Sequence, residues 1–255
     1  MKFKTTPYHF DLLKDEKRVS AFYEAINTLP TNGDVAYDLG CGSGILSFFL
    51  HPFFKEIIAI EQDIKASNCA EENLAIFENI NVVNGDVLNY NFPKKADLFV
   101  CEMLDTALID EEEVPILNQV RKYLKKDGKI IPQGVINIIE LVNLERNYIH
   151  YDENVNYETL SNPIVYDEIN FLEEINPNFE DVITLKANKD AVINGVKITT
   201  ITKLTHNIVC GPTPMLNPPL LIPLDERDVK CNDLINVKLK YSMGKGIGTI
   251  KINYD

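Results

Sequence analysis

A glycine-rich turn between two apolar runs constrains this chain more than any other feature. Residues 35–45 read Val-Ala-Tyr-Asp-Leu-Gly-Cys-Gly-Ser-Gly-Ile, so an apolar run ends in an acid and then meets glycine at every second position. Glycine tolerates a positive φ angle and lets a ligand approach the backbone. A helix that begins after the turn offers unpaired N–H groups to a carboxylate or phosphate. The stretch predicts a strand, a tight turn and a helix that bind a nucleotide-like ligand.

Two acids and the glycine spacing argue against a dinucleotide site. Such sites read G-x-G-x-x-G, whereas the third glycine, Gly44, comes one residue early here. Asp38 stands two residues before Gly40, and Glu61 ends the next apolar run. The D-x-G-x-G-x-G pattern resembles motif I of the class I S-adenosylmethionine-dependent methyltransferases. That resemblance implies that the glycine turn faces the methionine part of the cofactor and that Glu61 binds its ribose hydroxyls.

The first 134 residues alternate between predicted strands and predicted helices. This order implies right-handed βαβ units and a parallel sheet, whose ligands bind beyond the carboxyl ends of the strands. The glycine turn, Glu61, Asp86 and Glu102 all follow predicted strands, so we expect them at that edge. Hydrophobic patterning places the strands at 35–39, 56–60, 81–83, 98–101 and 128–131, and the helices at 16–29, 45–50, 64–77 and 112–124.

The sequence changes character after Gly134, where β-rich runs replace the alternation. Asn194-Gly195 predicts a hairpin turn, and one short helix is expected at 167–175. We therefore predict an α/β fold, with a Rossmann-like, doubly wound, mostly parallel sheet at residues 1–134 and a β-rich, substrate-binding domain at residues 135–255. The strands expected in the second domain are 135–142, 198–204, 234–241 and 246–254, the last two as a hairpin.

Composition and charge narrow the function classes. The chain has 255 residues and a net charge of −13, without the basic footprint that nucleic-acid binders usually carry. No run reaches the ~18 uncharged apolar residues of a membrane span. The cysteines stand singly, the histidines lack metal-ligand spacing, and residues 1–6 lack the apolar core of a signal peptide. We therefore expect a cytoplasmic protein with no metal, no membrane span and no nucleic-acid partner.

Three segments resemble the protein arginine methyltransferases. Residues 9–18 are similar to the motif that covers the cofactor in that family, and the glycine turn through Glu61 forms the second segment. The third segment, 97–132, contains Glu102 and Glu111 at the spacing of the family's double-glutamate loop. The resemblance implies S-adenosylmethionine as cofactor, a barrel-like form for the β-rich domain and a protein substrate.

The same resemblance implies roles for individual residues. Arg18 would pair with the carboxylate of the cofactor, Asp86 would lie near its adenine, and Glu102 and Glu111 would hold the target. The predicted catalytic residues are Glu102 and Glu111, and the predicted cofactor-binding residues are Arg18, Asp38, Gly40, Cys41, Gly42, Glu61, Gln62, Asp86, Val87 and Glu102.

A pair of carboxylates suits a nitrogen nucleophile. A guanidinium stays protonated and attacks poorly, so two carboxylates that grip two of its nitrogens direct the third toward the methyl group and draw positive charge from it. A neutral imidazole fits the same pair, because one carboxylate holds its N–H while the other nitrogen attacks. Methyl transfer from a sulfonium needs no general acid, so it depends on positioning and electrostatics. We predict methylation of a protein side-chain nitrogen, with arginine first and histidine second.

Departures from the family keep other functions open. The chain has no tryptophan, and residues 216–220, which correspond to the family's threonine-histidine-tryptophan loop, contain no histidine. Asn217-Pro218-Pro219-Leu220 imitates the N-P-P-[YF] motif of methyltransferases that act on nucleic-acid bases. The alternatives are an RNA or DNA base methyltransferase and a non-catalytic scaffold that keeps the cofactor fold. A homodimer also stays open, although the family's dimerisation arm is not evident in the sequence.

Overall fold

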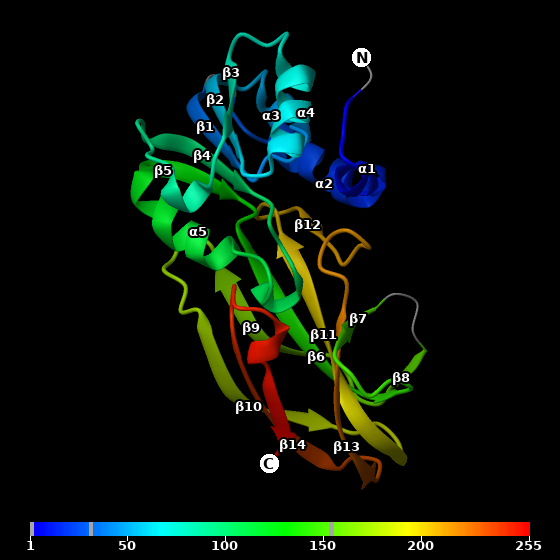
Figure 1. Cartoon of the computed structure of the whole chain (residues 1–255). Helices are drawn as coiled ribbons and strands as arrows, with labels where there is room; N and C mark the ends of the chain where they lie inside the picture. Colours follow the sequence, from blue (N-terminus) through cyan, green and yellow to red (C-terminus); the bar gives the residue numbers. More distant parts are fainter. Residues whose placement is uncertain (1–2, 31–32, 153–155) are drawn as a thin grey trace.

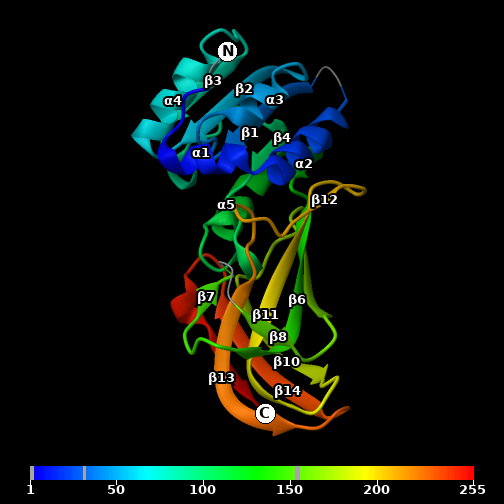
Figure 2. The same cartoon turned by 90° about the vertical axis from the view of Figure 1, so that its right-hand side faces the viewer.

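Five parallel strands form the first sheet, in the order β3-β2-β1-β4-β5. The computed structural model describes residues 3–30, 33–152 and 156–255. Figures 1 and 2 show helices packed around this sheet, with the β-rich domain at one end of it. The strands are β1 (Gly33–Leu39), β2 (Phe54–Glu61), β3 (Ile80–Asn84), β4 (Ala96–Cys101) and β5 (Leu124–Ile131). The helices are α1 (Pro7–Lys14), α2 (Glu16–Asn27), α3 (Ile45–Leu50), α4 (Ile64–Leu74) and α5 (Glu113–Val120), with 3-10 turns η1 (Val87–Asn89), η2 (Thr106–Leu108) and η3 (Arg121–Tyr123).

The order of the strands reverses between β1 and β4, and this reversal places the candidate site. Ligands of open parallel sheets bind in the crevice outside the carboxyl ends of the strands, where the order changes. Leu39, at the end of β1, pairs with both Ile60 and Cys101. The residues that follow these three in the chain, which are Gly40, Glu61 and Glu102, therefore start from one edge of the sheet.

Sequence patterning misses α1, a helix of eight residues of which none is buried. Pro7 is its first residue, and Thr6 caps it by accepting a hydrogen bond from the N–H of His9. Asp15 ends α1 and caps α2, since its carboxylate accepts from the N–H of Arg18 at 3.1 Å. Capping therefore fixes the ends of α1, which carries His9, whereas α2, which carries Arg18, also has a buried face.

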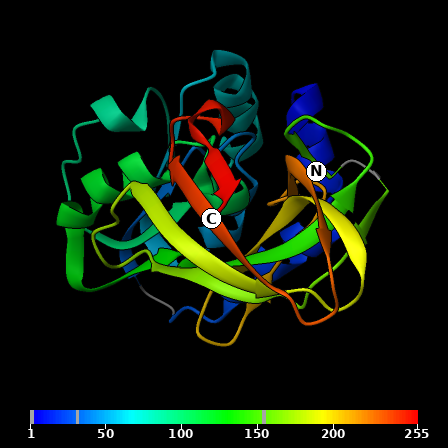
Figure 3. The same ribbon diagram turned by 90° about the horizontal axis from the view of Figure 1, so that it is seen from below.

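Two antiparallel sheets form the β-rich domain (Figure 3), and their buried side chains belong to a hydrophobic core that continues into the parallel sheet. One sheet has the order β7-β13-β11-β6-β8, with β12 paired to β11 and β9 paired to β6, and the other has the order β10-β14-β15. β14 and β15 form the predicted hairpin. The strands are β6 (Gly134–Leu144), β7 (His150–Tyr151), β8 (Tyr157–Thr159), β9 (Ile164–Asn170), β10 (Asn178–Lys186), β11 (Ala191–Lys203), β12 (Val209–Cys210), β13 (Leu220–Val229), β14 (Leu234–Ser242) and β15 (Lys251–Tyr254), with the 3-10 turn η4 (Ile247–Thr249) before β15.

Two expectations for this domain are wrong. The helix expected at 167–175 is strand β9 and a following loop, because residues 164–170 pair with β6. Asn194-Gly195 is not a hairpin turn but lies inside β11, where the pairing with β13 shifts register. The Asn194 side chain bonds both the N–H and the carbonyl of Leu144. A Cβ on Gly195 would lie 2.8 Å from the carbonyl oxygen of Ile222, so these two residues serve a bulge rather than a turn.

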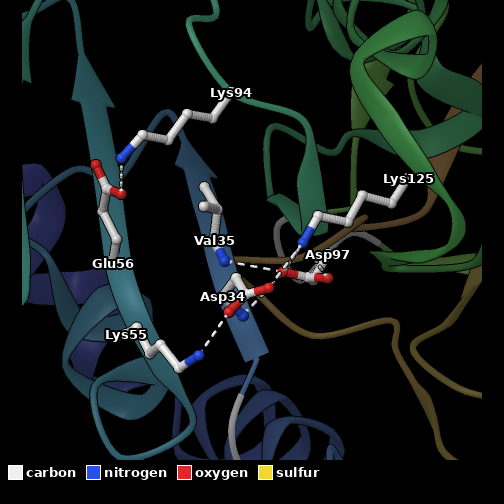
Figure 4. A network of polar contacts seen from close by, with 7 residues as sticks. All are labelled: Asp34, Val35, Lys55, Glu56, Lys94, Asp97 and Lys125. Carbon is white, nitrogen blue, oxygen red and sulfur yellow. Dashed lines mark hydrogen bonds and ion pairs between the residues drawn. The ribbon is translucent and has the colours of Figure 1, made fainter.

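Charged side chains join the strands at the opposite, amino-terminal edge of the parallel sheet (Figure 4). Asp97, in β4, accepts hydrogen bonds from the N–H groups of Asp34 and Val35, each at 2.9 Å, and pairs with Lys125. Asp34 in turn pairs with Lys55 and Lys125. These contacts link β1, β2, β4 and β5 at the edge remote from the glycine turn.

Candidate active site

A cavity of about 270 Å³ opens at the carboxyl ends of β1, β2 and β4. Side chains of α1 and α2 lie on one side of it, and Met215 reaches it from the β-rich domain. All residues predicted for the site except Asp38 line this single cavity: Arg18, Gly40, Cys41, Gly42, Glu61, Gln62, Asp86, Val87, Glu102 and Glu111.

The glycine turn forms one wall of the cavity in a conformation that only glycine adopts easily. Gly40, Gly42 and Gly44 have φ angles of +71°, +55° and +89°. A Cβ on Gly40 would lie 2.9 Å from the sulfur of Met103, and one on Gly42 would lie 2.7 Å from Nε2 of His9. The glycines therefore bring side chains of α1 and of the loop after β4 directly against the backbone of the turn.

Glu61 is the last residue of β2, and two backbone N–H groups hold its carboxylate oxygens in place. Oε2 accepts a hydrogen bond from the N–H of Gly42 and Oε1 accepts one from the N–H of Asp63, each at 2.8 Å. The residue is only 8% exposed. Each oxygen of a carboxylate has a second lone pair, so Glu61 keeps the capacity to accept hydrogen bonds from two hydroxyl groups of a ligand.

Asp38 does not line the cavity, although the sequence assigns it to the cofactor. It is buried behind the turn, and its Oδ2 accepts a hydrogen bond from the hydroxyl of Ser47, in α3, at 2.6 Å. Burial raises the pKa of Asp38 to about 7, against the effect of the Ser47 hydrogen bonds. The contact of Asp38 is therefore with α3, and any effect of this carboxyl on a ligand passes through the turn.

The far end of the cavity carries Asp86, which caps the 3-10 turn η1. Its Oδ1 accepts from the N–H of Leu88 at 2.8 Å, and its Oδ2 accepts from the side-chain amide of Asn89 at 2.6 Å. Asn84 donates hydrogen bonds to the carbonyls of Glu61 and Gln62, which ties the ends of β2 and β3 together. Each carboxylate oxygen of Asp86 has a second lone pair, so this end of the cavity offers hydrogen-bond acceptors.

Arg18 and Glu102 form a buried ion pair in the wall of the cavity. The Nε of Arg18 donates to Oε1 of Glu102 at 3.0 Å, and Nη2 donates to Oε2. A third nitrogen, Nη1, donates to the carbonyl of Leu12 at 3.3 Å. Burial opposes the charge on Arg18, but Glu102 outweighs burial and raises the pKa of the guanidinium. The fork geometry fixes Glu102 at a defined position at the end of β4.

Glu111 lines the same cavity from the far end of the loop that begins at Glu102. Its pKa is raised by burial and by the negative charge of Glu102. Glu113 lies beneath this loop, fully buried, and accepts a hydrogen bond from the N–H of Met103 at 3.1 Å. Burial, with the charges of Glu102 and Glu111, raises the pKa of Glu113 well above its ordinary value. The cavity is lined by five carboxyl side chains (Glu61, Asp86, Glu102, Glu111 and Glu112) and by one arginine, Arg18, and this excess of acids favours a cationic group.

Several lining residues escape the sequence assignment. Tyr8 and His9 come from α1, Leu12 stands where the resembled motif usually has methionine, and Met215 comes from the loop before β13. The H-x-x-x-L-x-D-x-x-R pattern of residues 9–18 covers His9 and Leu12, and Tyr8 directly precedes it. Nothing local marks Met215, whose N–H donates to Asp15 from 200 positions away in the chain.

Three further features of the described residues bear on function: the state of Cys41, metal-ligand groups and membrane-spanning helices. Burial raises the pKa of the Cys41 thiol well above its ordinary value, which favours a packed, protonated side chain. Among the described residues, no three or more His, Cys, Asp or Glu side chains form a group that could hold a metal ion. No helix within 3–30, 33–152 and 156–255 has the length and apolarity needed to cross a bilayer.

Comparison with known proteins gives three findings. Residues 36–128 match a family described as a methyltransferase domain. An uncharacterized protein of Methanothermobacter thermautotrophicus is 44% identical over 251 residues, and the match covers 98% of each chain. Protein arginine N-methyltransferase 2 of Xenopus laevis is 30% identical over 141 residues, and the match covers 51% of this chain and 32% of that protein. The solved enzyme-prozyme complex of Trypanosoma brucei PRMT1 with AdoHcy superimposes with a TM-score of 0.80 at 16% identity, covering 92% of this chain and 87% of that one. This last likeness confirms the predicted fold: a Rossmann-like sheet with a barrel-like β domain.

Proposed function

Since the chain belongs to the class I S-adenosylmethionine-dependent methyltransferases and resembles their protein arginine methyltransferase family, we propose that it methylates a nitrogen of a protein side chain. Arginine is the first candidate target and histidine the second. The single observation that carries this proposal is that Glu102 and Glu111 line the same cavity as the glycine turn and Glu61. A cation at the two glutamates is thereby beside the ligand that the turn and Glu61 hold.

The residues of the cavity suit S-adenosylmethionine. When bound, this cofactor supplies a methyl group on a sulfonium. Glu61 would accept hydrogen bonds from the ribose hydroxyls, and Asp86 and Val87 would flank the adenine. Arg18 would bind the carboxylate through the N–H groups that Glu102 and Leu12 leave free. Gly40 and Gly42 carry no side chain at the cavity wall, so the methionine part would meet the backbone of the turn beside Met103 and His9. The free lone pairs of Glu61 fit this arrangement.

Glu102 and Glu111 orient the target and hold its charge. Two carboxylates that each bind one nitrogen of a guanidinium leave the third nitrogen free to attack, with its plane fixed by paired hydrogen bonds. Burial first, and then the negative charges of Glu102, Asp110 and Glu112, raise the pKa of Glu111, and a bound cation favours its ionised form. The product guanidinium keeps its positive charge after it loses one proton, so the same pair binds substrate and product.

The base-methyltransferase alternative gains no support from its motif. Asn217 is fully buried, its side-chain amide donates to Thr202 at 2.7 Å, and the carbonyl of Pro218 accepts from the hydroxyl of Thr106. None of residues 217–220 lines the cavity. The N-P-P-L string therefore packs the β-rich domain against the loop after β4.

The proposal is tested with Glu102→Gln and Glu111→Gln, each compared with Glu71→Gln on the exposed face of α4. Purified protein and S-adenosylmethionine labelled in the methyl group are incubated with lysate of cells that lack the gene, and the lysate is then treated with protease or nuclease. We expect protease-sensitive label, a loss of about 100-fold or more for the two site variants, and no change for Glu71→Gln.

Cofactor affinity separates the possible outcomes. Calorimetry should give Glu111→Gln a Kd for S-adenosylhomocysteine within a few-fold of the wild type, because Glu61, Arg18 and the turn are intact, whereas Glu102→Gln also removes the charged partner of Arg18. Label that nuclease removes and protease leaves would transfer the assignment to a nucleic-acid substrate. Cofactor binding without any labelled product would favour the scaffold.

A further inference from the structure

The loop that carries Glu111 is wound around one buried carboxylate. Asp105 is 8% exposed, and its Oδ2 accepts hydrogen bonds from the N–H groups of Ile109 and Asp110, each at 3.0 Å. Its Oδ1 accepts a third from the N–H of Glu111 itself at 3.2 Å. Three successive N–H groups thus point at a single side chain, and the last belongs to the proposed catalytic residue.

The β-rich domain closes this arrangement from the outside. The hydroxyl of Tyr151, in β7, donates to Oδ2 of Asp110 at 2.5 Å and lies 3.3 Å from Oδ2 of Asp105. The other oxygen of Asp110 accepts from the N–H of Ile247, in the β14–β15 hairpin, at 2.9 Å. One phenol therefore bridges the two carboxylates that stand beside Glu111.

Backbone contacts from the same domain fix the rest of the loop. The N–H of Gly244 donates to the carbonyl of Leu108 at 2.9 Å, and the N–H groups of Lys245 and Gly246 donate to the carbonyl of Ile109. The N–H of Ala107 donates to the hydroxyl of Thr200, in β11, at 2.8 Å. The loop has no regular structure of its own between η2 and α5, so these contacts supply its shape.

We propose that Asp105 and Tyr151 are positioning residues for Glu111, so that the β-rich domain completes the methyl-transfer site by setting one of its two carboxylates. This inference rests on the proposed function for its catalytic meaning, but the arrangement itself is a property of the loop. Neither residue lines the cavity, so both act through the backbone of residues 109–111. Loss of either one leaves Glu111 present but free to move away from the position that faces Glu102.

The electrostatics of the cluster agree with this role. Burial raises the pKa of Asp105 to about 6, and the backbone hydrogen bonds oppose that rise. At neutral pH the carboxylate is therefore ionised and accepts from all three N–H groups. Burial and the two aspartates also raise the pKa of Tyr151, so the phenol stays protonated and remains a donor.

Tyr151→Phe is the central test, because it removes one hydroxyl and keeps the ring. Tyr148→Phe is the matched control, since Tyr148 lies three positions earlier and is 53% exposed. Amide hydrogen exchange of the full chain reads the loop directly. We expect exchange at residues 109–111 to quicken about tenfold in Tyr151→Phe and to stay unchanged in Tyr148→Phe. Asp105→Asn should have a larger effect at the same amides, because an amide nitrogen cannot accept from them.

Two further readouts separate positioning from general stability. S-adenosylhomocysteine affinity should stay within about twofold in Tyr151→Phe, while methyl transfer to lysate protein falls about tenfold or more, as expected for a displaced orienting group. Unchanged exchange at residues 109–111 in Tyr151→Phe overturns the positioning role, whether or not any methyl transfer is detected. Faster exchange together with wild-type methyl transfer overturns the link to catalysis. Absence of methyl transfer by the wild type refutes the proposed function alone, since the exchange pattern is measured without substrate.

Discussion

Replacement of Glu61 by glutamine tests the basis of the site most directly. Both oxygens of Glu61 already accept from backbone N–H groups, those of Gly42 and Asp63, at 2.8 Å. In Glu61→Gln, the side-chain NH₂ must face one of these donors, so one hydrogen bond to a charged acceptor is lost, at about 1.5–3 kcal/mol. The remaining oxygen is neutral and serves one ribose hydroxyl instead of two. We expect cofactor binding to weaken by about 2–4 kcal/mol, or about 30-fold to several-hundred-fold in Kd.

Isothermal titration calorimetry with S-adenosylhomocysteine measures this loss, with Glu71→Gln as the control. Thermal unfolding followed by circular dichroism establishes that the Glu61→Gln protein is folded at the titration temperature. A Kd for the folded variant within threefold of the wild-type value would refute the argument that this carboxylate holds the sugar. Equal weakening in Glu71→Gln would point instead to the overall charge of the protein.

Two further predictions concern stability. Asp97→Ala leaves the N–H groups of Asp34 and Val35 without their acceptor, so we expect the free energy of unfolding in urea to fall by about 1–3 kcal/mol. The control is Asp34→Ala, at an exposed position, which should leave the urea midpoint unchanged. Burial raises the pKa of Asp38 to about 7 in the folded protein, so the unfolded chain loses this proton first as pH rises, and the contribution of Asp38 to stability falls between about pH 4 and about pH 7. Asp38→Asn should lack that slope, and the difference from wild type should change by up to about 4 kcal/mol across this range in urea titrations; parallel pH profiles would contradict the burial argument.

The parallel sheet could be predicted because its signals are local. β1 and β2 end in five consecutive buried residues each, so both read as short apolar runs in which the only charged residue is an acid near the end, Asp38 or Glu61. Glycines and acids at their ends mark the turns. α1 was not found in this way, since it has eight residues and none of them is buried. Its ends are set by the side chains of Thr6 and Asp15, which accept hydrogen bonds from the N–H groups of His9 and Arg18.

The β-rich domain was harder to predict because distant pairing decides its elements. Residues 164–170 alternate apolar and polar only in part, and their strand conformation comes from the ladder with β6, about thirty positions earlier. Asn194-Gly195 has the composition of a turn, yet β11 continues through it because β6 and β13 pair on both sides. In both cases the local preference was weaker than pairing with distant strands, which is with β6 for β9 and with β6 and β13 for β11.

The two proposed catalytic glutamates show the same division within one loop. Glu102 directly follows β4, so the rule for carboxyl ends of parallel strands places it in the crevice without any knowledge of other proteins. Glu111 lies in a segment of irregular structure, and only the family resemblance assigned it to the site. The structure supplies a physical reason in Asp105, which is close in sequence, and Tyr151, which is 46 positions from Asp105. An orienting carboxylate on an irregular loop needs such support from a rigid neighbour, and here the strands of the second domain provide it. The β-rich domain is therefore expected to matter for methyl transfer even where it does not touch the target.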